Sequence, residues 1–222
     1  KRKETEDKIM TKALLIVDVQ NGFCPGGNLP VPEGDKTVPV INRLIDGGGY
    51  DYIVASQDWH PADHGSFASQ HPGKNVFDMG TLSGQPQMMW PDHCVQGTPG
   101  AELAAGLPWE RVSAVIRKGA DPRVDSYSTF RNNWDPDGRR PPTGLTGYLM
   151  ERGVTDVFIC GLARDYCVKW SAEDAAGAGF RTHVIWDLTR PVDPASDDDV
   201  VRDLVRAGAR IVYLDQLRPG AG

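Results

Sequence analysis

Side chains that can do chemistry follow several apolar runs of this 222-residue chain at the points where the runs end. They are Asp18 after 13–17, Asp58 and His60 after 52–55, Lys118 after 112–116, and Cys167 a short step after 157–160. A cysteine can act as a nucleophile beside a carboxylate that accepts the thiol proton and later returns it. A nearby lysine and the start of a helix lower the pKa of such a thiol. The set predicts attack by Cys167, with Asp18 as the acid–base group.

Each of these residues also has a plainer interpretation when it is taken alone. Buried cysteines are common, so the helical position of Cys167 by itself favours a core residue. Asp18 is equally compatible with a satisfied carboxylate at a strand end, and Lys118 with a solvated surface residue. Only the placement of all three at one edge of a sheet favours a catalytic site, because ligands of open α/β sheets bind beyond the carboxyl ends of the strands.

A second pattern predicts a metal site. Residues two apart in an extended segment point the same way, so Asp58 and His60 can face one ion. His93 lies in the same long, polar excursion, over 57–111, and can supply a third ligand. Two histidines and one carboxylate suit zinc, iron or manganese and leave coordination positions open. Asp-x-His is a weak motif by itself, and Cys94, directly after His93, is a less favourable ligand.

The apolar runs predict an α/β fold in a single domain over 11–222, after a tail at 1–10. The runs are rich in β-branched residues without strict alternation, which is typical of strands buried on both faces. They cover 13–17, 52–55, 112–116, 157–160, 183–186 and 211–214. Helical patterns at 35–45, 143–152, 165–178 and 196–207 lie between most of them, and Ser196 is expected as the N-cap of the last. The order predicts a mainly parallel sheet of about six strands flanked by helices, a Rossmann-like three-layer arrangement.

Composition excludes several classes of protein. The chain is 40% hydrophobic and 24% charged, with a formal net charge of −6, which argues against a nucleic-acid partner. It has neither GxGxxG nor a P-loop, and its apolar runs are far shorter than the ~20 residues of a membrane helix. The four cysteines, which contain no CxxC pair, exclude a disulfide scaffold and a zinc finger. We therefore expect a cytoplasmic protein with neither membrane nor nucleic-acid partners.

Five segments together resemble the nicotinamidases, also called pyrazinamidases, of the isochorismatase-like cysteine hydrolases. They are ALLIVDVQNGFCPGG (13–27), QDWHPADHGSF (57–67), WPDHCVQGTPGAE (90–102), KGADPRVDSYSTF (118–130) and CGLARDYCVKWSAED (160–174). The resemblance spans nearly the whole chain, roughly residues 12–215. WPDHCVQGTPG is the most specific piece, because it is typical of the nicotinamidase branch.

The resemblance implies a role for each matching residue. Asp18 corresponds to the general base, Lys118 to the lysine of the site and Cys167 to the nucleophile, and the amides of Ala163 and Cys167 would form the oxyanion hole. The Leu162–Ala163 peptide bond would be cis. One divalent metal ion (zinc, iron or manganese) would be held by Asp58, His60 and His93, with His64 as a further ligand in some members only. Phe23 and Trp90 would sandwich the pyridine ring, and Gln20 would line the pocket.

The implied activity is the hydrolysis of nicotinamide, and of pyrazinamide, to the carboxylic acid and ammonia through a cysteine thioester, a step in NAD salvage. The alternative is an isochorismatase-like hydrolase of another small amide or carbamoyl compound. A non-catalytic binding protein is disfavoured by the intact Asp18, Lys118 and Cys167. Arg164 departs from the family, which often has Thr or Ser there, and Trp170 is bulkier than expected, so both bear on substrate preference. A homo-oligomer is compatible with the resemblance.

Overall fold

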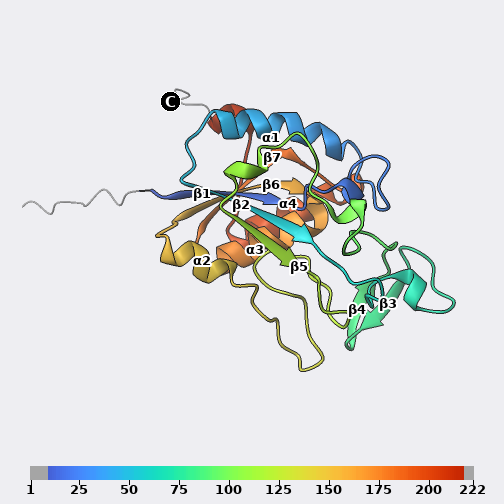
Figure 1. Cartoon of the computed structure of the whole chain (residues 1–222). Coiled ribbons are helices and arrows are strands. Elements are labelled where there is room, and N and C mark those ends of the chain that lie inside the picture. The colour runs from blue at the N-terminus through green and yellow to red at the C-terminus, as the bar shows by residue number, and fades with distance from the viewer. Residues whose placement is uncertain (1–9, 218–222) are drawn as a thin grey trace, which may run out of the picture.

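Six parallel strands form the central sheet of the computed structural model, which describes residues 10–217 (Figure 1). In chain order they are β1 (Lys12–Val17), β2 (Tyr52–Asp58), β5 (Ala114–Lys118), β6 (Asp156–Leu162), β7 (Arg181–Arg190) and β8 (Arg210–Val212). In space the order is β5-β2-β1-β6-β7-β8, and every neighbouring pair is parallel. The predicted fold class is confirmed. Residues 1–9 of the predicted tail lie outside the described residues.

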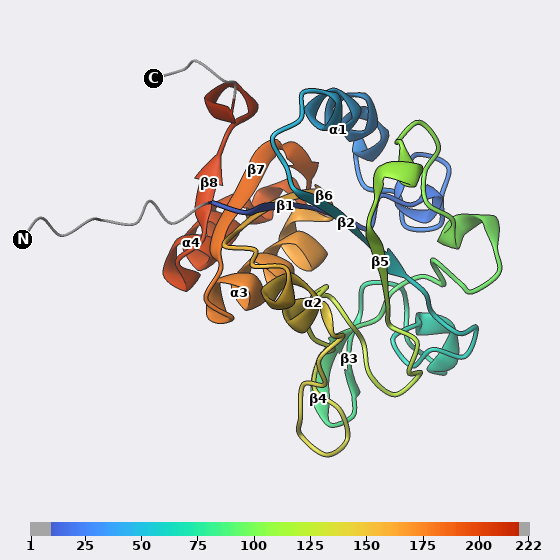
Figure 2. The ribbon, with the colours of Figure 1, turned by 60° about the vertical axis from the view of Figure 1, so that its left-hand side comes forward.

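Helices cover both faces of the sheet (Figure 2). α1 (Thr37–Asp46) packs on one face, where Leu14 and Ile16 of β1 point. α2 (Leu145–Glu151), α3 (Lys169–Gly177) and α4 (Asp197–Ala207) pack on the other, with Leu15 and Val17. Alternate residues of β1 therefore enter different clusters, which explains why its sequence is apolar throughout. Within residues 10–217, no helix has the length and apolar character needed to cross a membrane.

The long segment 57–111 contains a hairpin that sequence patterns did not predict. β3 (Met79–Leu82) and β4 (Gln85–Met88) pair antiparallel, joined by Ser83 and Gly84, which both have positive φ. Two central residues of positive φ suit the twist of a tight hairpin. Much of this hairpin is exposed, so its sequence carries no clear apolar alternation.

Ser196 stands at the N-cap position of α4 as expected, but its side chain makes no capping hydrogen bond there. A short 3-10 turn, Pro194–Ser196, precedes the helix, and the side chain of Asp193 accepts a hydrogen bond from the amide of Ala195 (2.9 Å). The hydroxyl of Ser196 instead donates to the carbonyl of Asp193 (2.6 Å). Asp, like Ser, is a good capping residue, and here the side-chain capping hydrogen bond forms upstream, at the start of the 3-10 turn.

The first residues of the helix expected over 165–178 form a distinct element instead. A wide π-type turn covers Arg164–Val168, and α3 begins only at Lys169. Such turns occur frequently at functional sites. Cys167 therefore lies in the wide turn between β6 and α3.

Asp156, at the start of β6, makes stability depend on pH. Its buried carboxylate accepts hydrogen bonds from Arg181 and Thr155, and His183 Nε2 lies 3.3 Å away. Burial alone would raise the pKa of this carboxyl, but its partners lower it from 3.8 to about 2. A pKa that is lower in the folded state stabilises the fold above about pH 4, and this stabilisation is lost as the pH falls through about 2.

We expect Asp156→Asn to lower the free energy of unfolding by about 1–2 kcal/mol at pH 6. This figure is discounted because Arg181, the main partner of Asp156, is half exposed to solvent. Roughly half of the difference should remain at pH 3. Urea unfolding of both proteins at both pH values measures it. Asp198→Asn, at an exposed carboxyl of α4, controls for the loss of one charge. A difference that is equal at pH 6 and pH 3 would mean that Asp156 acts through packing rather than charge.

Candidate active site

The carboxyl ends of four neighbouring strands bring the predicted chemical residues together. Asp18 follows β1, Asp58 ends β2, Lys118 ends β5, and Cys167 follows β6. These strands are adjacent in the sheet, and Figure 1 shows β1, β2 and β5 running towards this edge. All four side chains are buried, and Asp18 has a left-handed φ of 46° where the chain leaves β1.

Lys118 is the hub of this cluster. Its Nζ lies 2.8 Å from Asp18 Oδ2, 2.5 Å from Asp58 Oδ1 and 3.5 Å from Cys167 Sγ. It also donates to the carbonyl of Ser126 (2.8 Å). One ammonium group therefore contacts both carboxylates and the thiol, and its orientation is determined by four partners.

The charges of the cluster support one another. Burial alone would lower the pKa of Lys118, but the carboxylates of Asp18 and Asp58 raise it well above its ordinary value. Burial raises the pKa of Asp18, and Lys118 opposes this. Burial also favours a raised pKa for Asp58, but Lys118 and His60 hold it well below the ordinary value. Lys118 is thus a permanent cation, Asp58 a permanent anion, and Asp18 the carboxyl best suited to exchange a proton.

The pKa of Cys167 contradicts the expectation of an acidified thiol. Burial raises it well above the ordinary value, and Asp18 and Asp58 raise it further against the opposing effect of Lys118. The thiol is therefore protonated at rest. Carboxylate oxygens of Asp18 and Asp58 lie within 4.8 Å of the sulfur. Proton transfer to a neighbouring base must then accompany nucleophilic attack.

A buried group of two histidines and one carboxylate adjoins the cluster. Asp58 Oδ2 lies 3.4 Å from His60 Nε2 and 3.7 Å from His93 Nε2. The Nδ1 atoms of the two rings face the carbonyls of Gly119 (2.8 Å) and Pro91 (2.7 Å), which turns both Nε2 atoms towards the carboxylate. Such carbonyl contacts are how proteins orient metal-binding histidines. The donor set therefore fits a divalent metal ion.

Two details strengthen this fit. Gly119 has a φ of 71°, and a Cβ there would come within 2.3 Å of the ring of His60, so only glycine leaves room for this ligand. Burial would lower the pKa of His60, but Asp58 raises it. A proton and a metal ion compete for the same ring nitrogen, so a cation between these groups would replace that proton. Asp58 belongs to both sites, with Oδ1 on Lys118 and Oδ2 facing the histidines.

His64 lies beside the metal group, and its ring centroid is 4.4 Å from that of His60. Its Nδ1 accepts a hydrogen bond from the amide of Ser66 (3.2 Å). With His60 and Asp125 it forms a second buried group of ligand-type atoms. Burial and the neighbouring His60 lower the pKa of His64 to about 4, so the ring is neutral near pH 7.

A small cavity lies between the nucleophile and the metal group. Phe23 and Trp90, the expected aromatic residues, line it together with Ala163 and Cys167, and the Leu162–Ala163 bond is cis as the resemblance implied. Further lining residues not singled out from the sequence are Leu29, Asp125, Tyr127, Tyr166 and Val192. Tyr166 directly precedes the nucleophile, and Tyr127 lies in the family-like segment 118–130, so both positions carried a usable signal.

Gln20 does not line this cavity. Its amide nitrogen donates to the carbonyls of Asp58 and Ala101 (2.9 Å each), and its oxygen accepts from the amide of Asp58 (2.8 Å). Gln20 therefore holds the backbone of Asp58. Ser56 plays a related part for Asp18, since its hydroxyl donates to Asp18 Oδ1 (2.6 Å).

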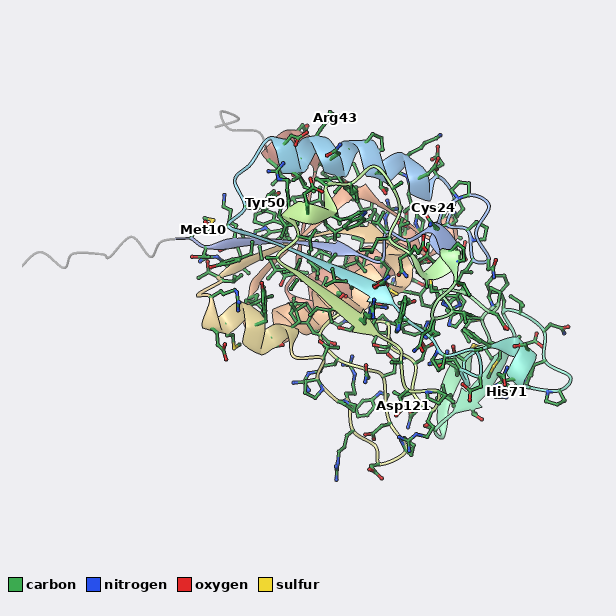
Figure 3. The ribbon with its side chains drawn as sticks, in the orientation of Figure 1. Met10, Cys24, Arg43, Tyr50, His71 and Asp121 are labelled. Atoms are coloured by element: carbon green, nitrogen blue, oxygen red, sulfur yellow. The ribbon has the colours of Figure 1, made fainter. Side chains whose placement is uncertain are left out.

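A larger hollow in the described part of the chain lies at the opposite end of the sheet, between α1 and β6, where Arg43 and Tyr50 line it. Figure 3 shows Tyr50 towards the end of the sheet where β1 begins, and Cys24 and His71 towards the other. This hollow contains no cysteine, histidine or carboxylate, so size does not identify the active site.

Comparisons with known proteins agree with this geometry. The isochorismatase domain model matches residues 12–216. The nicotinamidase of Escherichia coli is 47% identical over 207 residues, which is 91% of this chain and 95% of that protein. The solved structure of the Acinetobacter baumannii nicotinamidase/pyrazinamidase superposes with a TM-score of 0.88 at 41% identity, covering 95% of this chain and 100% of the other. A pyrazinamidase of Pyrococcus horikoshii in complex with zinc gives 0.72 at 36% identity, covering 91% and 99%. The chain therefore belongs to the isochorismatase family, in the branch formed by the nicotinamidases.

Proposed function

We propose that this chain hydrolyses nicotinamide to nicotinate and ammonia, with Cys167 as nucleophile and Asp18 as acid–base group. The observation that carries the proposal is the buried Lys118, whose ammonium touches Asp18, Asp58 and the Cys167 sulfur at the wall of an aromatic cavity. The 47% identity to a nicotinamidase over most of the chain supports the choice of substrate. The same aromatic cavity and the same chemistry extend to pyrazinamide.

The first half of the reaction transfers the acyl group to the enzyme. The Cys167 sulfur attacks the amide carbon as the thiol proton passes to Asp18, whose pKa burial has raised. The backbone N–H groups of Ala163 and Cys167 stabilise the oxyanion that forms. Asp18 then delivers its proton to the amide nitrogen, the C–N bond breaks, and ammonia leaves behind a thioester.

The second half returns the free enzyme. Water attacks the thioester carbon while Asp18 takes one of its protons, and the carbon–sulfur bond breaks as Asp18 gives that proton to Cys167. Lys118 remains charged throughout, because two carboxylates face it. Its ammonium orients Asp18 and offsets negative charge that develops on the sulfur.

Asp58, His60 and His93 would hold one divalent metal ion, and we propose zinc, iron or manganese from the mixed nitrogen and oxygen donors. A bound cation supplies Lewis acidity towards a pyridine nitrogen, which orients the ring and withdraws electron density from it. The zinc complex of the related pyrazinamidase supports this assignment. We place the reaction in NAD salvage in the cytoplasm, in keeping with four cysteines that are all free.

Replacing a histidine of the metal group tests the assignment of the metal ligands. We expect His93→Ala to lower both the metal content per chain and kcat/KM by at least ~10-fold, because one of three protein ligands is lost. Elemental analysis of dialysed protein and an ammonia-release assay measure the two quantities. His71→Ala, in the same excursion but bonded through Nε2 to the carbonyl of Gly65, is the matched control. Unchanged metal content in His93→Ala would remove His93 from the ligand set.

An ammonia-release assay on nicotinamide, pyrazinamide and a panel of small amides and carbamoyl compounds tests the function itself. We expect the highest kcat/KM for nicotinamide, with measurable turnover of pyrazinamide. A clear preference for a carbamoyl compound, with nicotinamide at background, would favour the alternative of a different isochorismatase-like hydrolase.

A further inference from the structure

Arg164 lies between the two predicted oxyanion amides, directly after Ala163 and three residues before Cys167, yet its side chain takes no part in lining the cavity. The side chain is 7% exposed, and its guanidinium stacks over the ring of Trp186, 3.9 Å from the ring centroid. Its Nε donates to Thr189 Oγ1 (2.8 Å), and Nη2 donates to the carbonyls of Thr189 (3.0 Å) and Trp186 (3.2 Å). Nη1 is paired with Asp197 Oδ2 (2.7 Å).

These contacts connect the nucleophile turn to two other elements. Trp186 and Thr189 belong to β7, and Asp197 is the first residue of α4. The sequence run Asp197–Asp199, which looks like a solvated helix start, is therefore engaged at its first member with a buried cation. A planar guanidinium that forms bonds in several directions fixes a backbone segment more rigidly than a lysine can.

The next residue adds a second attachment of the same turn. Asp165 accepts hydrogen bonds from the amides of Val192 and Asp193, each at 2.9 Å. Val192 is itself a cavity residue. Side chains at two successive positions thus fasten the turn Arg164–Val168: Arg164 to β7 and α4, and Asp165 to the segment that connects them.

We propose that Arg164 is a positioning residue for the oxyanion site: it holds the turn that carries Cys167 and the amides of Ala163 and Cys167, and acts on the reaction without touching substrate. Arg164 adjoins one oxyanion amide in sequence, so a shift of its anchor moves that amide directly. A misplacement of about 1 Å at a reacting centre can cost ~100-fold in rate. This inference rests on the proposed function of the site.

The test compares Arg164→Lys with a matched control, Arg140→Lys. Arg140 likewise pairs with a carboxylate, that of Asp174, here through both oxygens, and lies over a tryptophan ring, that of Trp170. It is remote from the nucleophile turn in sequence and does not line the cavity. Both variants keep the positive charge and lose the planar guanidinium. Thermal melting of the two proteins therefore measures how much stability that loss costs.

The readouts separate the transition state from ground-state binding. Nicotinaldehyde carries an aldehyde in place of the amide, so addition of the Cys167 sulfur to its carbon, with the thiol proton passing to Asp18, places an oxyanion at the amides. Its inhibition constant therefore reports the oxyanion site. Nicotinate has a planar carboxylate, so its affinity reports ground-state binding in the aromatic cavity. We expect Arg164→Lys to reduce kcat and nicotinaldehyde affinity in parallel, by ~10–100-fold, with less than a ~3-fold change in nicotinate affinity.

Asp197→Asn is a second, milder variant for the case that Arg164→Lys fails to fold. It weakens one contact of Arg164, and Asp197 is partly exposed. We expect the same pattern on a smaller scale, ~3–10-fold. Nearly unchanged kcat and aldehyde affinity in folded Arg164→Lys and Asp197→Asn, or equal weakening of aldehyde and nicotinate, would overturn the proposal. A parent enzyme that neither hydrolyses nicotinamide nor binds the aldehyde would instead overturn the proposed function.

Discussion

Cys167→Ala is expected to abolish ammonia release from nicotinamide, with a loss of at least ~10⁴-fold in kcat, because among the described residues Cys167 is the one cysteine that lines the cavity. The cavity that we propose binds the ring is lined mainly by other side chains, so nicotinate should still bind. In the parent enzyme, acid quenching during turnover should trap an acyl group on Cys167, detectable by mass spectrometry of the peptide.

A second buried cysteine provides the matched control. Cys160 lies in β6, seven positions earlier, and its thiol points into the core towards the carbonyl of Leu15 (3.8 Å). Cys160→Ala removes the same atoms from an equally buried place, so it should reduce stability and leave kcat near that of the parent enzyme. Full activity of Cys167→Ala, or an acyl group found on another cysteine, would refute the assignment of the nucleophile.

Asp18→Asn is expected to lower kcat by at least ~10³-fold with a much smaller change in KM. Asparagine keeps the shape of the side chain and can still accept from Ser56, but it cannot take up and return a proton. The fold should tolerate the change, because Lys118 keeps its contacts with Asp58 and with the carbonyl of Ser126. Steady-state kinetics and thermal melting measure these effects.

The same variant has a second readout with a definite sign. Asp18 is one of the groups that raise the pKa of Cys167, so removing its charge should move that pKa down. Alkylation of Cys167, followed by peptide mass spectrometry against pH, should therefore reach half its maximal rate at a lower pH in Asp18→Asn. Asp156→Asn, which removes a buried carboxylate far from the cavity, should change neither quantity. Normal turnover in Asp18→Asn would assign the proton transfers to another group.

Burial explains why the pKa of Cys167 is raised, although a neighbouring lysine would lower it. Lys118 alone would favour a thiolate at Cys167, but the sulfur is desolvated and also faces two carboxylates. The cluster therefore stores its proton on sulfur and transfers it only when the amide carbon is attacked. Asp58 links this cluster to the metal group, because its two oxygens face Lys118 on one side and the histidines on the other.

The sequence by itself determined the fold class and the identity of the chemical groups. Apolar runs such as 13–17 and 157–160 are local signals, since strands covered on both faces must be apolar throughout. The rule that ligands bind beyond the carboxyl ends of such strands then pointed to Asp18, Asp58, Lys118 and Cys167. The hairpin β3–β4 gave no such signal, because its partly exposed strands need no alternating apolar pattern.

Only the tertiary structure decided how these groups interact. The contacts of Lys118 with Asp18, Asp58 and Cys167 join residues 49 to 100 positions apart, and the direction of each pKa shift depends on the balance of burial against neighbouring charge. The serines that hold Asp18 and Lys118 look ordinary in the sequence, and Gln20 looks like a pocket residue until its hydrogen bonds to Asp58 are seen. Arg164 is a similar case. The sequence marks this residue as unusual, but its contacts with β7 and α4 form only because folding brings residues 186–197 against the nucleophile turn.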